Sequence, residues 1–120
     1  MTFATLADAE FISIETFRRN GEGVRTPTWQ TPEDGKLYVW TMGGSGKVKR
    51  IRRNEAVRVC RCDMAGNPLG EWVDAKARVL DSEAEIAQQR ERMLAKYGER
   101  FSQFGGAGGD RVVVEIRPSA

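Results

Sequence analysis

The segment with the clearest chemical character runs from Thr41 to Arg53 and combines hydroxyl groups, glycines and bases. Three glycines between positions 43 and 46 let a backbone approach a ligand closely and present consecutive N–H groups to it. Residues 47–53 hold five bases and no acid, which leaves 14 bases against 17 acids in the rest of the chain. A short helix starting near Lys47 would add the positive end of its dipole, where phosphate binds well. The segment predicts a local anion site; the alternative is a solvated, positively charged hairpin loop.

The polar side chains of this segment divide into hydroxyl donors and cations. Thr41 and Ser45 would donate hydrogen bonds to an anion, and the bases would neutralise it. We expect Lys47 and Lys49 to be exposed loop charges. The segment is not a Walker A loop, because Val48 follows Lys47 where that motif has serine or threonine.

Several residue types that catalysis commonly uses are missing or too few. The chain has no histidine, which excludes a Ser-His-Asp or Cys-His relay and a His-ligated zinc or haem site. Cys60 and Cys62 have no further sulfur to complete a metal site, and in a strand their side chains point to the same face. We expect two buried, reduced cysteines, with redox chemistry as the alternative. An enzyme with this sequence would take its difficult chemistry from an organic cofactor.

Two tryptophans lie near the basic segment in the predicted topology. Trp29 and Trp40 fall on adjacent strands that enter and leave the same sheet. Either ring can belong to the core, which is the common place for a strand tryptophan. The alternative is a stacking platform for a planar ring system beside the anion site. Pro27 cannot donate to a ladder, so it places its strand at an edge or a bulge, or leaves it partly unpaired around a ligand.

Length and composition indicate one globular domain over residues 1–120. The chain is 40% apolar and 30% charged, and no apolar run approaches the ~20 residues of a membrane span. The N-terminal MTFATLADAEF has two acids and no base, unlike a signal peptide, so we expect a cytoplasmic protein without a membrane span. A nucleic-acid module that uses residues 47–53 is a further alternative. The acidic remainder and the absence of an RRM, KH or helix-turn-helix pattern count against it.

Hydrophobic patterning and turn signals predict a mainly β chain. Asn20-Gly21 and Asp34-Gly35 supply hairpin turns between the first three strands. Alternation in the fifth strand makes Leu69, Val73, Ala75, Ala77 and Val79 its buried face. The predicted strands are 11–19, 24–30, 37–42, 56–63, 69–80 and 112–116. Six strands with hairpin connections in 120 residues favour a small antiparallel barrel.

Two helices accompany these strands. Residues 4–10 read as one or two helical turns, with Thr5 as a possible N-cap. Ser82 and Glu85 form a capping box that opens a second helix, and Gly98 ends it near Tyr97. Its apolar stripe consists of Ile86, Arg90, Met93, Leu94 and Tyr97. A flexible glycine loop is predicted over 104–109.

With these elements in place, the chain resembles a known family. The pieces TFRRNG, VRTPTW, LYVWT and GKVKRIRRN, taken as a set, resemble the pyridoxamine 5′-phosphate oxidase-like superfamily of FMN-binding split barrels. They are most similar to its PPOX-class branch, which uses the deazaflavin coenzyme F420. The resemblance covers about Leu6 to Leu80, and the ending VVVEIRP fits the last strand of the family. The chain is about half as long as the phosphate oxidase proper and lacks histidine, so oxidation of pyridoxine phosphate is not expected.

The resemblance implies a fold, a partner and an activity. The fold is a six-stranded antiparallel split β-barrel with a short N-terminal helix and a longer helix before the last strand. It is a homodimer with each cofactor in a groove between subunits. The activity is F420-dependent reduction, in which a hydride passes from the reduced deazaflavin to an unsaturated small-molecule substrate. The alternatives are FMN in the same groove and a non-enzymatic flavin or haem carrier, although the missing histidine argues against ordinary haem ligation.

The resemblance also indicates which residues contact the cofactor. Two groups of residues are implied: a strand that faces the cofactor ring, and a clamp around the phosphate and the ribityl chain. Together they comprise Thr26, Pro27, Thr28, Trp29, Trp40, Thr41, Met42, Ser45, Gly46, Lys47, Lys49 and Arg50. No residue is assigned a catalytic role and none a metal. A proton can come from solvent, and Tyr38 is the side chain considered as an alternative donor.

Overall fold

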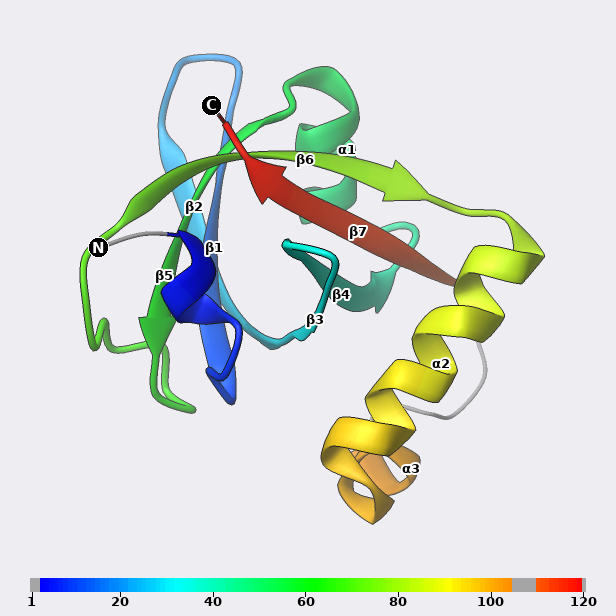
Figure 1. The fold of residues 1–120 in the computed structure, drawn as a ribbon. Helices are drawn as coiled ribbons and strands as arrows, with labels where there is room; N and C mark the ends of the chain where they lie inside the picture. Colours follow the sequence, from blue (N-terminus) through cyan, green and yellow to red (C-terminus); the bar gives the residue numbers. More distant parts are fainter. Residues whose placement is uncertain (1–2, 105–109, 120) are drawn as a thin grey trace.

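One antiparallel sheet with the strand order β2-β1-β5-β6-β7-β4-β3 organises the chain (Figure 1). The computed structural model describes residues 3–104 and 110–119, and the seven strands lie within them. The strands are β1 (Phe11–Phe17), β2 (Gly23–Trp29), β3 (Thr31–Glu33), β4 (Lys36–Met42), β5 (Ala56–Cys62), β6 (Val73–Leu80) and β7 (Arg111–Pro118). The helices are the 3₁₀ helix η1 (Phe3–Leu6), α1 (Gly46–Arg53), α2 (Glu83–Tyr97) and α3 (Glu99–Phe104).

The sheet curls because its two edge strands are joined by a single residue. β2 and β3 lie at opposite ends of the strand order, yet only Gln30 separates them in the chain. Gln30 is fully buried, and its Nε2 donates to the carbonyl oxygens of Leu6, Ala7 and Ala9 at 3.2, 3.2 and 2.7 Å. These bonds fix the N-terminal segment against the point where the two edges approach each other. The result is the curled half-barrel seen in Figure 1.

Two apolar clusters fill the molecule. The larger one lies inside the curl and takes alternate residues of the strands, because successive side chains of a strand face opposite sides. Its members include Ile12, Ile14, Leu37, Val39, Val57, Val59, Ala75, Ala77, Val114 and Ile116. The second cluster lies between the sheet and the α2–α3 segment, and consists of Trp40, Met93, Tyr97 and Phe101, with Trp29 and Ile86 packed against it.

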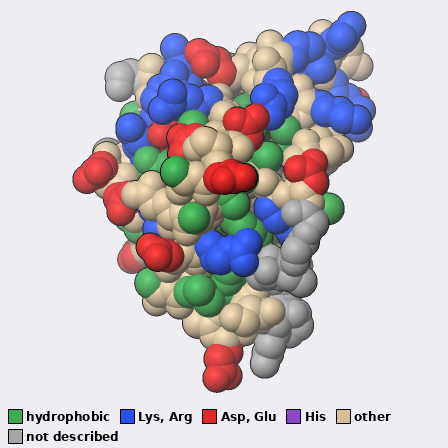
Figure 2. Space-filling model, turned by 90° about the vertical axis from the view of Figure 1, so that its right-hand side faces the viewer, with side chains coloured by type: hydrophobic (Ala, Val, Ile, Leu, Met, Phe, Trp, Pro, Cys, Tyr) green, Lys and Arg blue, Asp and Glu red, His purple; other side chains and the backbone are tan. Residues whose placement is uncertain are grey.

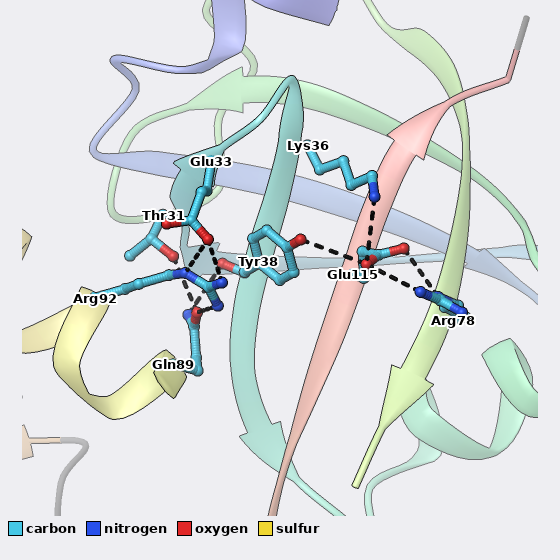
Figure 3. Close-up of polar contacts among 8 residues, drawn as sticks. All are labelled: Thr31, Glu33, Lys36, Tyr38, Arg78, Gln89, Arg92 and Glu115. Atoms are coloured by element: carbon cyan, nitrogen blue, oxygen red, sulfur yellow. Dashed lines mark hydrogen bonds and ion pairs between the residues drawn. The ribbon is translucent and has the colours of Figure 1, made fainter. Parts of the chain in front are cut away.

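Buried polar contacts attach α2 to β3 and β4 (Figure 3). The Gln89 amide donates to the Tyr38 carbonyl oxygen at 3.3 Å, and its Oε1 accepts from Thr31 at 3.1 Å. Arg92 donates to Gln89 Oε1 at 3.1 Å and pairs with Glu33. Because Gln89 has partners for both ends of its amide, a polar side chain is tolerated at the centre of this helix–sheet contact.

Local signals in the sequence located most of these elements correctly. Asp34 and Gly35 both have positive φ, 52° and 75°, as the predicted two-residue hairpin requires. Ser82 caps α2 by accepting from the Glu85 N–H, and Gly98, with φ 60°, follows its last residue. β2 is an edge strand, which confirms the expectation drawn from Pro27.

Other expectations were wrong in detail. The N-terminal helix is a single 3₁₀ turn, and β3 makes the strand count seven rather than six among the described residues. The strand predicted from Leu69 begins at Val73, and just before the predicted start Pro68 makes only an isolated bridge to Cys62.

Burial also departs from the predicted patterns. Leu69 is 60% exposed and Leu94 is 42% exposed, so neither belongs to the buried face predicted for it. In α2, Gln89 takes the central buried position instead. Helix α3 occupies the chain up to Phe104, and the rest of the predicted glycine loop lies outside the described residues. No helix in the described part of the chain has both the length and the apolar character that a membrane crossing requires.

We expect Tyr97→Phe to lower the free energy of unfolding by about 1–3 kcal/mol, measured by urea denaturation. The Tyr97 hydroxyl accepts from the Gln30 N–H at 3.1 Å, so its loss leaves that buried donor without this acceptor. Leu94→Ala, on the exposed side of the same helix, is the control and should change stability by less than about 0.5 kcal/mol. Equal effects of the two substitutions would contradict the role given to the Gln30 junction.

Candidate functional site

A short turn over residues 43–45 joins the end of β4 to the first turn of α1, so the fold brings the glycines and bases of this segment to one place. Ser45 is the N-cap, and its Oγ accepts from the Val48 N–H at 3.3 Å. The Lys49 N–H donates to the Ser45 carbonyl oxygen at 3.2 Å. The N–H groups of Gly46 and Lys47 have no acceptor within the helix, as expected for a first turn. This end of α1 therefore presents two N–H donors and a positive dipole end.

Lys47 is buried, which corrects the expectation of an exposed loop charge. It is 8% exposed, and no hydrogen bond or ion pair joins its ammonium to the described residues. Desolvation, with a smaller contribution from Arg50, lowers the pKa of Lys47 to about 8. A buried cation without a counterion destabilises the protein that holds it. The position therefore favours an anion supplied from outside the chain. Lys49, by contrast, is exposed as expected.

Arg50 lies against the same turn and is fixed by β1. Its Nε donates to Thr16 Oγ1 at 2.7 Å. A Cβ placed on Gly46 would lie 2.7 Å from Arg50 Nη1, so the guanidinium packs closely against this glycine. Burial, and then the nearby Arg18 and Arg53, lower the pKa of Arg50. The mutual repulsion of these cations is a further cost that a bound anion would offset.

A hollow of about 310 Å³ lies beside this turn. It is lined by Arg18, Arg19, Gly46, Lys49, Arg50 and Arg53, with no carboxylate among these residues. Arg53 is held by a 2.8 Å bond to the Phe17 carbonyl oxygen, and Arg18 pairs with Glu22 at 3.2 Å on the surface. In Figure 2, basic side chains gather at the upper end of the molecule, where Figure 1 places α1 and the β1–β2 turn.

Arg18 and Arg19 were missed by the sequence reasoning. Their signal was present as two adjacent arginines directly before the Asn20-Gly21 turn. Their proximity to α1 depends on the pairing of β1 with β2 and β5 and on the packing of α1 over β1, which no local pattern reports.

The residues proposed to face the cofactor ring lie elsewhere on the curled sheet. Thr26 and Thr28 are half-buried on β2, Pro27 is exposed, and β2 pairs only with β1 in the described structure. Trp29 stacks on Tyr97 with ring centroids 4.4 Å apart and planes 14° apart. Trp40 is buried with its ring edge-on to Phe101.

Both tryptophans thus pack in the cluster under α2 and α3. Of the clamp residues, Ser45, Gly46, Lys47, Lys49 and Arg50 lie together on α1, with Thr41 and Met42 just before it at the end of β4. The contact of Trp29 and Trp40 with a cofactor ring stays a prediction. The Trp29 Nε1–H is buried and has no hydrogen-bond partner among the described residues.

Tyr38, considered as a proton donor, is buried beside a group of hydrogen-bonded and charged side chains (Figure 3). Its hydroxyl donates to Glu115 Oε2 at 3.4 Å, and Glu115 also pairs with Arg78 at 2.9 Å and Lys36 at 3.9 Å. Burial and the Glu115 carboxylate raise the pKa of Tyr38. The Tyr38 hydroxyl is therefore already hydrogen-bonded to Glu115, where β4 pairs with β7.

The cysteines are structural. Cys60 and Cys62 are both buried free thiols, which confirms the expectation for a reduced pair. Burial, and then Asp63 and Cys60, raise the pKa of Cys62 to about 11, which keeps it in the unreactive thiol form at neutral pH.

The curled antiparallel sheet and its neighbours in known structures define a split β-barrel. An F420 reductase superposes with a TM-score of 0.65 at 18% identity, over 100% of this chain and 95% of that one. The haem storage protein HutZ from Vibrio cholerae (15% identity) and an FAD-binding protein from Mesorhizobium loti (17% identity) each give a TM-score of 0.71, over 98% of this chain and 86% of theirs. At these identities the likeness establishes the fold.

The family follows from the sequence itself. Residues 2–120 match the family described as pyridoxamine 5′-phosphate oxidase. The chain therefore belongs to the pyridoxamine 5′-phosphate oxidase family. A comparison with curated protein sequences gives no significant match. The family includes oxidoreductases, and the structural neighbours named above are an F420 reductase, an FAD-binding protein and a haem storage protein.

We expect Lys47→Met to raise the free energy of unfolding of the cofactor-free protein at pH 7 by roughly 1–3 kcal/mol, measured by urea denaturation. The folded-state pKa of about 8 lies below the ordinary 10.5, so burial penalises the charged form fully below pH 8. The folded wild type loses this penalty as the pH rises from about 8 to 10.5, and the advantage of the variant should shrink over that range.

Lys49→Met is the matched control, because Lys49 is exposed one helical position beyond Val48 and should change stability little at either pH. A Lys47→Met protein no more stable than wild type at pH 7 would contradict the assignment of a buried, unpaired charge.

Proposed function

We propose that the protein is an F420-dependent reductase whose α1 turn binds the phosphate of the cofactor. The observation that carries this proposal is Lys47, a buried cation without a partner in the described structure, on the first turn of a helix. A phosphate group supplies the negative counter-charge that Lys47 and Arg50 lack. Its oxygens can also accept hydrogen bonds from the backbone N–H groups of Gly46 and Lys47. The residues present therefore fit a phosphorylated cofactor.

The sequence features that resemble the F420-using branch support the choice of deazaflavin. The F420 reductase among the structural neighbours is compatible with it at the level of the fold. Reduced F420 supplies a hydride to an unsaturated small molecule. The protein binds and orients the two reactants, and solvent is the source of any proton, because Tyr38 is engaged with Glu115.

Strand β2 is the proposed place for the cofactor ring and for the approach of a second subunit. Thr26, Pro27, Thr28 and Trp29 lie along an edge strand whose outer side pairs with no described residue, so a ring or a second subunit can approach it. We place the cofactor in a groove between the two subunits of a homodimer, in the cytoplasm.

FMN in the same site is the second candidate. It also joins a tricyclic ring to a ribityl phosphate, so the contacts on α1 apply to it equally. The FAD-binding neighbour is a reason to test it, since it shows that this fold accommodates a flavin in another protein. A flavin carrier without enzymatic activity would use the same residues.

We expect fluorescence titration to show binding of F420 in preference to FMN. Lys47→Ala and Lys49→Ala should each weaken binding roughly 10- to 150-fold, corresponding to ~1.5–3 kcal/mol for a charge-assisted bond to phosphate, with a larger loss in the double variant. Arg52→Ala is the control, because Arg52 pairs with Asp81 at 3.4 Å on the surface and does not line the hollow.

The outcomes separate the candidates. If only FMN binds, and its binding depends on Lys47 in the same way, then FMN is the cofactor and the proposed site on α1 stands. An unchanged dissociation constant in the double variant would remove α1 from the cofactor site, provided that Arg52→Ala behaves like wild type.

A further inference from the structure

A second hollow, of about 490 Å³, lies at the opposite end of β1 from the basic one. Its lining includes Phe11 at the start of β1, Cys62 at the end of β5, and Met64 and Leu69 on the segment that joins β5 to β6. Met64 and Leu69 are the two most exposed large hydrophobic side chains of the described residues, at 77% and 60%. Pockets of roughly 300–1,000 Å³ with mostly apolar walls are those that hold small organic molecules.

The backbone holds Met64 and Leu69 in these exposed positions. Asp63 Oδ1 accepts from two backbone N–H groups of the turn that contains Met64, each at 2.9 Å. The Leu69 N–H donates to the Arg61 carbonyl oxygen at 2.7 Å. The apolar surface of the hollow is therefore formed before a ligand arrives, which lowers the ordering cost of binding.

The charged groups that line this hollow already have partners. Glu10 pairs with Arg100 at 2.5 Å, and Arg61 pairs with Asp8. The Asp63 carboxylate accepts from the backbone of its own turn. The hollow beside α1, in contrast, is lined by bases with no carboxylate among them. An ionic ligand would lose water here without gaining a free counter-charge, so this hollow favours an uncharged molecule.

The hollow adjoins the part of β2 assigned to the cofactor ring. Trp29 lies directly opposite Phe11 in the β1–β2 register, and the two ring centroids are 6.5 Å apart. The guanidinium of Arg100, another wall of the hollow, lies 5.8 Å from the centroid of the Trp29 ring. A cofactor ring bound along Thr26 to Trp29 would thus have apolar surface beside it, with the phosphate near Arg18 at the other end of the hairpin.

We infer that the hollow between Phe11, Met64 and Leu69 binds the hydride-accepting substrate, and that this substrate is an uncharged, largely apolar, unsaturated molecule. The inference rests on the proposed function, because only a cofactor ring on β2 makes the occupant a substrate. The preference for uncharged apolar molecules follows from the lining of the hollow itself.

The test uses the full chain, labelled with ¹³C at its methionine methyl groups and observed by NMR without cofactor. The probe is methyl cinnamate, an uncharged ester with a conjugated double bond, and its matched control is cinnamate, which carries a carboxylate on the same skeleton. We expect methyl cinnamate to shift the Met64 methyl signal saturably. The signal of Met42, which is exposed but does not line the hollow, should stay unchanged. Cinnamate should bind at least about tenfold more weakly.

Leu69→Asp should weaken the binding of methyl cinnamate at least about tenfold, because it removes apolar contact and adds a carboxylate to the hollow. Leu94→Asp is the matched control, since Leu94 is exposed on α2 outside the hollow, and it should bind methyl cinnamate like wild type. Light scattering of both variants should give the same mass as wild type.

Equal affinity for the ester and the acid, or a shift of Met42 in place of Met64, would overturn the inference. A mass that falls from two chains to one in Leu69→Asp alone would also overturn it, because the hollow would then belong to a contact between subunits. The inference and the proposed function can fail separately. If F420 binds in a Lys47-dependent way while methyl cinnamate leaves Met64 unchanged, only the inference fails. If methyl cinnamate binds beside Met64 while neither F420 nor FMN binds, the apolar site stands and the proposed reaction fails.

Discussion

The junction at Gln30 is the constraint on which the rest of the structure depends. One residue must join strands at opposite edges of the sheet, so the sheet has to curl until those edges meet. The Gln30 side chain fixes this geometry through the N-terminal carbonyls, and its backbone does so through Tyr97 on α2. Lys96 adds a 2.9 Å bond to the Gln30 carbonyl oxygen. Helix α2 is thus part of the closure and not an accessory to it.

Packing of α1 against the curled sheet produces the uncompensated charge of Lys47. The helix must pack its apolar side, Val48 and Ile51, against the barrel, and this packing buries Lys47 in the same turn. Arg50 is held on β1 by Thr16 and repelled by its neighbours. A protein rarely keeps such local conflicts unless a ligand relieves them. The proposed function assigns that relief to a cofactor phosphate.

Local signals predicted the capped helix α2, the Asp34-Gly35 hairpin and the edge position of β2, because each depends on a few neighbouring residues. The basic segment was recognised as a candidate anion site, but Lys47 was expected to be exposed. Its burial, and the approach of Arg18 and Arg19, depend on how α1 packs over β1. The position of Gln89 at the centre of α2 depends likewise on partners in β3 and β4. Long-range pairing of this kind leaves no trace in the local pattern.

The most direct test of the central claim is the pKa of Lys47 itself, followed by NMR in lysine-labelled protein with and without F420. The account predicts a value of about 8 in the cofactor-free protein. On saturation with cofactor the value should rise, because a neighbouring phosphate favours the charged amine. An ordinary value in the free protein, or a value that does not change on saturation, would contradict the claim that Lys47 is a buried charge awaiting a cofactor phosphate.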